Sequence, residues 1–166
     1  MKQLNFVSTV AFLLLALALP ALAAAPIFIE NPITPFPIPA GQGCGTFDVL
    51  VTPEKGKPSG GELIVFSNGN AVEAGPAFAT LTNTTTGKSI NLNVSGPTRV
   101  TVTTNTIVVM NRGLSLVFGA PPIAPPNLRG LALANGLIVT AIDISTGNIT
   151  SISFTGRAQN LCPLLE

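Results

Sequence analysis

The carboxylates are the side chains with the widest choice of chemistry in this 166-residue chain, which contains no histidine, tyrosine or tryptophan. Glycoside hydrolysis requires two Asp or Glu side chains that face each other across a cleft. Asp48 and Asp143 lie among alternating apolar residues and are expected inside strands, so they form the candidate pair for a carboxylate-based hydrolase acting on polysaccharide. Glu54, Glu62 and Glu73 fall in a loop or beside a hairpin, where a charge commonly marks an exposed position. Strand carboxylates that face solvent or accept local hydrogen bonds would give the same pattern, so the sequence assigns no catalytic residue.

The missing residue types exclude several other kinds of site. Without histidine, neither a Ser-His-Asp nor a Cys-His nucleophilic system can be assembled. Histidine-based zinc, copper and non-haem iron sites are excluded for the same reason, and no segment resembles a phosphate loop or a dinucleotide fingerprint. The absence of tryptophan and tyrosine also disfavours a carbohydrate-binding platform. We therefore expect no cofactor and no metal, and the composition favours a protein that is not an enzyme.

Cys44 and Cys162 are the only two cysteines, and they lie near the two ends of the presumed domain. In an oxidising compartment an even pair predicts one disulfide. The alternatives are two free thiols or a metal-binding pair, and the second is the weaker because no histidine completes such a site. A disulfide that closes a loop of this length is expected to add about 4–5 kcal/mol to the free energy of unfolding.

The N-terminus has the three parts of a secretory signal peptide: a positive charge at Lys2, an apolar run over residues 10–19, and the small residues Ala21 and Ala23. We expect cleavage after Ala23, which makes residues 1–23 the signal peptide and the mature protein extracellular. The alternative is an uncleaved membrane anchor, but the apolar run is shorter than the roughly 20 residues that span a bilayer.

The mature chain is formally neutral, with seven basic and seven acidic residues once Lys2 is removed. Because no block of like charge is present, the sequence favours neither nucleic acid nor an anionic membrane as a partner. Serine, threonine and asparagine supply most of the polar surface, and three asparagines begin N-glycosylation sequons: Asn83, Asn93 and Asn148. If the host is eukaryotic, we expect at least one of them to carry a glycan.

Residues 24–43 are rich in proline, which favours extended backbone and opposes helix. Apolar residues such as Ile27, Phe28 and Ile29 lie between the prolines, so this segment is no ordinary polar linker. We expect an extended arm that lies along its own domain, and the alternative is an arm that docks on a partner.

Residues 44–166 have the pattern of one all-β domain. Val49 and Val51 belong to the first of a series of segments in which apolar and polar residues alternate with a period of two. Turns rich in glycine and asparagine separate the segments, and a turn is expected at Asn135-Gly136. About ten short strands without an amphipathic helix predict a single compact β-sandwich or β-barrel, between which the pattern does not choose.

One turn sequence occurs twice. Thr-Thr-Gly at residues 85–87 and Ser-Thr-Gly at residues 145–147 each precede an alternating segment. We expect two hairpins with the same turn chemistry, the alternative being an internal duplication.

The layout of the chain resembles that of a known family. The segments that carry the likeness, besides the signal peptide and the cysteine before the first strand, are residues 81–87, 111–114, 143–147, 154–156 and 161–162. In these the chain is similar to small secreted β-rich proteins of actinomycetes and fungi, a family with no assigned activity. The resemblance therefore implies secretion and fold alone. The proline-rich segment 119–127 departs from that layout and interrupts the strands of the second half.

These observations lead to one expected function and two alternatives. We expect a non-enzymatic secreted protein with a structural or interaction role at the cell wall or cell surface, where the proline-rich arm contacts cell-wall polysaccharide or another surface protein. The first alternative is the polysaccharide hydrolase described above. The second is a carrier that holds a small apolar ligand inside a β-barrel.

Overall fold

The computed structural model describes residues 25–166 of the chain. The expected signal peptide, residues 1–23, lies outside the described residues.

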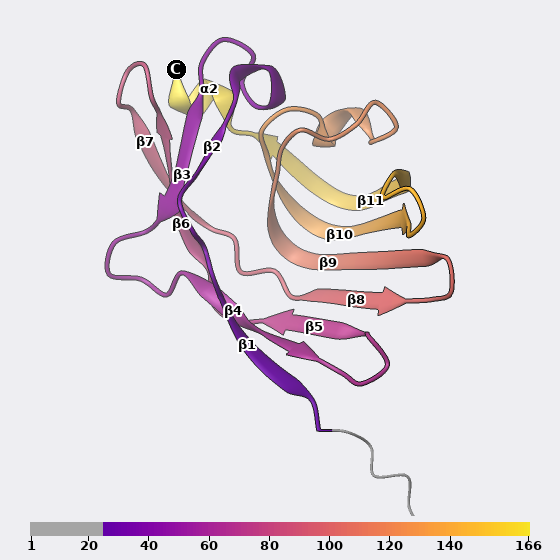
Figure 1. Ribbon diagram of the computed structural model, residues 1–166. Helices are drawn as coiled ribbons and strands as arrows, with labels where there is room; N and C mark the ends of the chain where they lie inside the picture. The colour runs from indigo at the N-terminus through magenta and orange to yellow at the C-terminus, as the bar shows by residue number, and fades with distance from the viewer. Residues whose placement is uncertain (1–24) are drawn as a thin grey trace, which may run out of the picture.

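Eleven strands form two antiparallel sheets that pack together without closing into a barrel (Figure 1). The seven-stranded sheet contains, in spatial order, β1 (Ile27–Pro32), β4 (Gly60–Val65), β5 (Ala71–Ala74), β8 (Thr98–Val102), β9 (Thr106–Val117), β10 (Ala132–Asp143) and β11 (Ile149–Asn160). The four-stranded sheet contains β2 (Phe36–Ile38), β3 (Val49–Pro53), β6 (Phe78–Asn83) and β7 (Ser89–Asn93), in that order. The all-β fold is therefore confirmed, and of the two expected architectures the structure has the sandwich-like one.

The chain passes repeatedly from one sheet to the other. It crosses after β1, β3, β5 and β7 (Figure 1). The last three strands, β9 to β11, stay in the seven-stranded sheet and form a continuous meander. The two sheets therefore meet along the crossing segments, and this junction positions the site described below.

The main core lies between the four-stranded sheet and the end of β9 and start of β10, where Leu116 and Leu133 pack on it. Val49 and Val51 on β3 are 0% and 1% exposed, as their alternation with polar residues predicts. Leu81 on β6 and Ile38 on β2 are fully buried in the same cluster. Burying such side chains contributes roughly 1.5–3 kcal/mol each.

The segment predicted as an extended arm is extended, and it supplies one edge strand to each sheet. β1 pairs with β4 in the seven-stranded sheet, and β2 pairs with β3 in the four-stranded sheet. Proline is tolerated here because Pro32 ends a strand and Pro37 lies on an edge, where a missing N–H need not break the ladder. A short 3-10 turn, η1 (Ala40–Gln42), follows.

The prediction of a turn at Asn135-Gly136 is wrong. β10 runs through this point without interruption, and Gly136 lies directly opposite Gly113 of β9 and Gly156 of β11. A Cβ atom on Gly136 would overlap the carbonyl oxygen of Thr155 and lie 2.8 Å from the Cα atom of Gly156. Gly136 and Gly156 let β10 and β11 approach closely, and the three strands curve together, as Figure 1 shows. Glycine here marks a bend in the sheet and not a reversal of the chain.

The twin turn sequences form equivalent hairpin turns, one between β6 and β7 and one between β10 and β11. Asn83 Oδ1 accepts hydrogen bonds from the backbone N–H groups of Thr85 and Thr86. Asp143 Oδ1 accepts from the backbone N–H of Thr146 at 2.9 Å and from the Ser145 hydroxyl at 2.6 Å. In both turns the glycine N–H donates to the backbone oxygen of the leading residue at 2.8 Å. The expectation of shared turn chemistry is confirmed.

The second proline-rich segment is a packed loop between β9 and β10. It contains the 3-10 turn η2 (Pro126–Leu128), and Leu128 is fully buried against Ala134 and Ile138 of β10. Arg129 Nε donates a hydrogen bond to the backbone oxygen of Ala124 at 3.1 Å, which ties the loop together. This segment therefore separates β9 from β10, as the sequence suggests, and its Leu128 packs on one face of the sheet.

Candidate functional site

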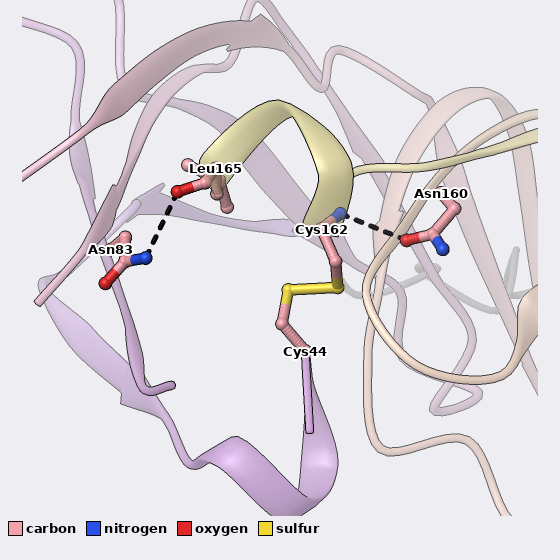
Figure 2. Close-up of a disulfide and its surroundings, with 5 residues drawn as sticks. All are labelled: Cys44, Asn83, Asn160, Cys162 and Leu165. Atoms are coloured by element: carbon pink, nitrogen blue, oxygen red, sulfur yellow. Dashed lines mark hydrogen bonds between the residues drawn. A yellow bond between two sulfur atoms is a disulfide. The ribbon is translucent and has the colours of Figure 1, made fainter. Parts of the chain in front are cut away.

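The predicted disulfide is confirmed and has a structural role. Cys44 and Cys162 are bonded, with their Cα atoms 5.2 Å apart, and the bond holds the short helix α2 (Cys162–Leu165) against the start of the β domain (Figure 2). Leu161 and Leu165, which precede and follow Cys162 in the chain, are both fully buried. Asn83 Nδ2 donates a hydrogen bond to the Leu165 backbone oxygen at 3.1 Å, which fixes the other end of the helix to β6.

The three sequon asparagines lie in different environments. Asn93 is exposed at the end of β7, and Asn148 is exposed in the turn before β11. Asn83 is only 2% exposed, and its Nδ2 atom, to which a glycan would be attached, is the donor in the bond to Leu165. The Asn83 side chain therefore serves the turn and the C-terminal helix, and the exposed sequon positions are Asn93 and Asn148.

The candidate catalytic carboxylates are not brought together. Asp48 lies just before β3 in the four-stranded sheet, where its Oδ1 accepts a hydrogen bond from the Ala40 backbone N–H at 2.8 Å. Asp143 ends β10 in the seven-stranded sheet, and Figure 1 shows the start of β3 and the end of β10 on opposite sides of the molecule. The Ser145 hydroxyl, followed by the backbone N–H and hydroxyl of Thr146, stabilises the Asp143 carboxylate and lowers its pKa. Both carboxylates serve local backbone structure, so the geometry does not assemble this acid–base pair.

A groove of about 320 Å³ lies where the two sheets meet, and we call it the inter-sheet groove. Crossing segments of the chain form much of its lining, namely Ile33 after β1, Gly75 and Ala77 after β5, and residues 94–96 after β7. Its volume falls at the lower end of the roughly 300–1,000 Å³ typical of small-molecule sites.

Three polar side chains line the groove in a row across the seven-stranded sheet. Glu73 of β5 is in register with Thr98 of β8, which is in register with Asn111 of β9. Directly opposed residues of antiparallel strands project from the same face, so Glu73, Thr98 and Asn111 share the face of the sheet that borders the groove. Thr98 Oγ1 donates to Asn111 Oδ1 at 2.7 Å, and Asn31 Nδ2 donates to Glu73 Oε1 at 2.8 Å.

The rest of the lining is largely apolar. Ile33, Phe36 and Leu116 pack on the main core cluster and also line the groove. The Phe36 and Phe118 rings lie with their centroids 5.5 Å apart, within the range of a favourable aromatic pair. The groove is therefore an open margin of the hydrophobic core with a polar row on one side.

Glu73 is the site residue that sequence reasoning placed wrongly. Its position beside a hairpin predicts an exposed strand charge, whereas the structure places it half-buried in the groove. Ala71, two residues earlier on the same side of β5, is 7% exposed, so this side of the strand is covered in the folded protein.

The outer edge of β1 forms a second surface of note. Ile27, Phe28 and Ile29 are 62%, 58% and 45% exposed, and among residues 25–166 β1 has a neighbouring strand on one side only, which is β4. Phe66, which follows β4, is also exposed. The first three residues of β1 are apolar, and Glu30, Asn31 and Pro32 follow in the same strand. Natural sheets usually protect an edge with charge, proline or short length, and the first half of β1 lacks such residues.

Within residues 25–166, no three His, Cys, Asp or Glu side chains cluster as metal ligands would. In the same part of the chain, no helix combines the length and the apolar character needed to cross a membrane. Comparison of the chain with protein-family models, with curated protein sequences and with solved structures found no match in any of the three.

Proposed function

We propose that the protein is secreted and acts outside the cell as a non-enzymatic structural or interaction protein, which binds an extended segment of another surface protein along β1. The exposed apolar edge of β1 carries this proposal. An edge strand offers unpaired backbone N–H and C=O groups, onto which a second extended chain can add as a further strand.

The chemistry of β1 suits a protein partner better than a polysaccharide. Sugar-binding platforms rely on tryptophan and tyrosine, both absent from the sequence, whereas Ile27, Phe28 and Ile29 offer aliphatic and aromatic surface. Three such side chains, each roughly half exposed, leave substantial apolar area for a partner to cover.

Secretion and glycosylation belong to the same proposal. The signal-peptide pattern of residues 1–23 and the disulfide both suit an oxidising extracellular setting. Asn93 and Asn148 are the exposed sequon positions, and we assign any N-glycans to them. Glycosidase treatment of protein secreted by a eukaryotic host should lower the mass of the native chain and leave an Asn93→Gln/Asn148→Gln variant unchanged.

The role of β1 is tested by retention at the cell surface. The native chain is secreted from a fungal host beside a triple variant, Ile27→Ser/Phe28→Ser/Ile29→Ser, and the medium, wall and membrane fractions are compared. The matched control removes three exposed apolar side chains elsewhere, at Ile123, Ile144 and Ile149, which are 52%, 43% and 39% exposed. We expect the β1 variant to move into the medium while the native chain and the control stay bound. Equal retention of all three proteins would contradict the proposal.

A further inference from the structure

The inter-sheet groove carries a single formal charge. Among the described residues that line it, Glu73 is the only charged one, and the remaining lining is apolar side chains, glycines, serines, threonine and asparagines. An apolar site with one carboxylate and no lining cation is electrostatically complementary to a ligand with one positive charge.

The Glu73 carboxylate is positioned but not fully occupied by its neighbours. Asn31 Nδ2 donates to Oε1 and thereby orients the group, while a carboxylate with two oxygens can accept further hydrogen bonds. The Thr98 hydroxyl donates its proton to Asn111 and so has none to donate to Glu73. The Glu73 carboxylate can therefore accept a hydrogen bond from a ligand in the groove. A charge-assisted hydrogen bond from an ammonium group is the strongest kind that such an oxygen accepts.

The apolar residues of the lining determine what kind of group the uncharged part of the ligand must be. Ile33, Phe36, Leu116 and Phe118 lie in the same groove as Glu73, and a volume of about 320 Å³ suits one ring or a short aliphatic chain. The hydroxyl of nearby Ser95 already makes two hydrogen bonds, because it accepts one from the Ala77 backbone N–H and donates one to the Ala77 backbone oxygen. Among the lining residues, Glu73 alone can recognise a positive charge on the ligand.

We propose that the inter-sheet groove binds a small apolar amine, with its ammonium group on the Glu73 carboxylate and its hydrocarbon part against Ile33, Phe36 and Leu116. This inference is independent of the proposed role of β1, because the two surfaces are tested by different variants. It also relocates the expected apolar-ligand site, which lies between two sheets and not inside a barrel.

The test uses three probes that share one ring and differ in charge: 2-phenylethylamine, 2-phenylethanol and phenylacetate. Binding to the full mature chain at neutral pH and low salt is followed by the backbone amide NMR shifts of the groove glycines at positions 61, 75 and 96. We expect the amine to bind at least about tenfold more tightly than the alcohol, in line with one charge-assisted hydrogen bond, and phenylacetate to give no saturable shift.

Two matched variants locate the effect. Glu73→Gln keeps an acceptor for Asn31 and should lower amine affinity to that of the alcohol, while alcohol binding stays unchanged and reports that the groove is intact. Glu54 also accepts a hydrogen bond from an asparagine, Asn91, at 3.3 Å but lies outside the groove, so Glu54→Gln should change nothing. Equal binding of amine and alcohol, an unaltered affinity in Glu73→Gln, or shifts confined to residues away from the groove would each overturn the proposal.

Discussion

Loss of the Cys44–Cys162 disulfide should be the most destabilising change to the chain that leaves its core side chains in place. The two cysteines are 118 residues apart, so the bond removes a large amount of conformational freedom from the unfolded state. The chain-entropy relation gives about 4.9 kcal/mol for a loop of this length at 25 °C. Domains of ordinary size are stable by roughly 5–15 kcal/mol, so a Cys44→Ala/Cys162→Ala variant should lose between a third and nearly all of its free energy of unfolding.

Equilibrium unfolding in urea measures this loss. Because the chain has neither tryptophan nor tyrosine, the transition is best followed by far-ultraviolet circular dichroism. With a urea dependence of about 2 kcal/mol per molar, a loss of 4.9 kcal/mol lowers the midpoint by about 2.5 M. A comparison variant is Asn83→Ala, which removes the bond to Leu165 and the two turn hydrogen bonds from Thr85 and Thr86 without opening the covalent loop, and should cost about 1–3 kcal/mol.

The result that refutes this reasoning is a double variant that loses less than about 1 kcal/mol. Such a result would mean that the unfolded chain gains little freedom when the bond is absent.

Three further predictions concern the sheets. Gly136→Ala should lower the free energy of unfolding by at least about 2 kcal/mol in the same urea assay, because the new methyl group overlaps the backbone of β11, whereas Gly41→Ala, with open space around its Cβ position, should be neutral. The lowered pKa of Asp143 means that its carboxylate stabilises the fold above the ordinary aspartate pKa of about 3.9, and that this contribution is lost as the pH falls through the lower folded-state value. Asp143→Asn should therefore unfold more easily than the native chain near pH 6, and the difference should shrink towards pH 2; a difference independent of pH would contradict the assignment. Glu30 lies directly opposite Glu62, so Glu30→Lys should replace a like-charge pair by an opposite-charge pair and raise stability by about 0.2–1 kcal/mol at low salt, with a smaller gain in 1 M NaCl.

The local sequence pattern was sufficient to predict those strands that bury one face. The alternation around Val49 and Val51 predicts β3, and both side chains are buried as expected. The disulfide follows from there being only two cysteines in a chain with a signal-peptide pattern. In each case the information lies within a few residues or in the composition.

The missed features depend on register between distant strands. Gly136 beside an asparagine reads as a turn, and only its alignment with Gly113 and Gly156 shows that it permits a bend. Asn83 begins a sequon, yet its amide serves the backbone oxygen of Leu165, 82 residues away. Both contacts are set by the tertiary fold, so a single sequence does not display them.

The groove was beyond prediction for a related reason. Which face of β5 is covered depends on where the four-stranded sheet ends, and that is decided by the crossings after β1, β5 and β7. Glu73 therefore resembles an ordinary surface charge in the sequence, although its neighbours in space are Asn31 and Thr98.

The order of strands in the two sheets has a consequence for how the chain can fold. In both sheets, every strand after the first pairs with a strand that precedes it in the chain, and no strand has to insert between two that are already paired. Each sheet can thus grow by addition at one edge, in the order in which the strands are synthesised. In a chain arranged in this way, the early strands can pair before the later segments have been made. Unpaired strand edges are therefore exposed to other chains for a shorter time.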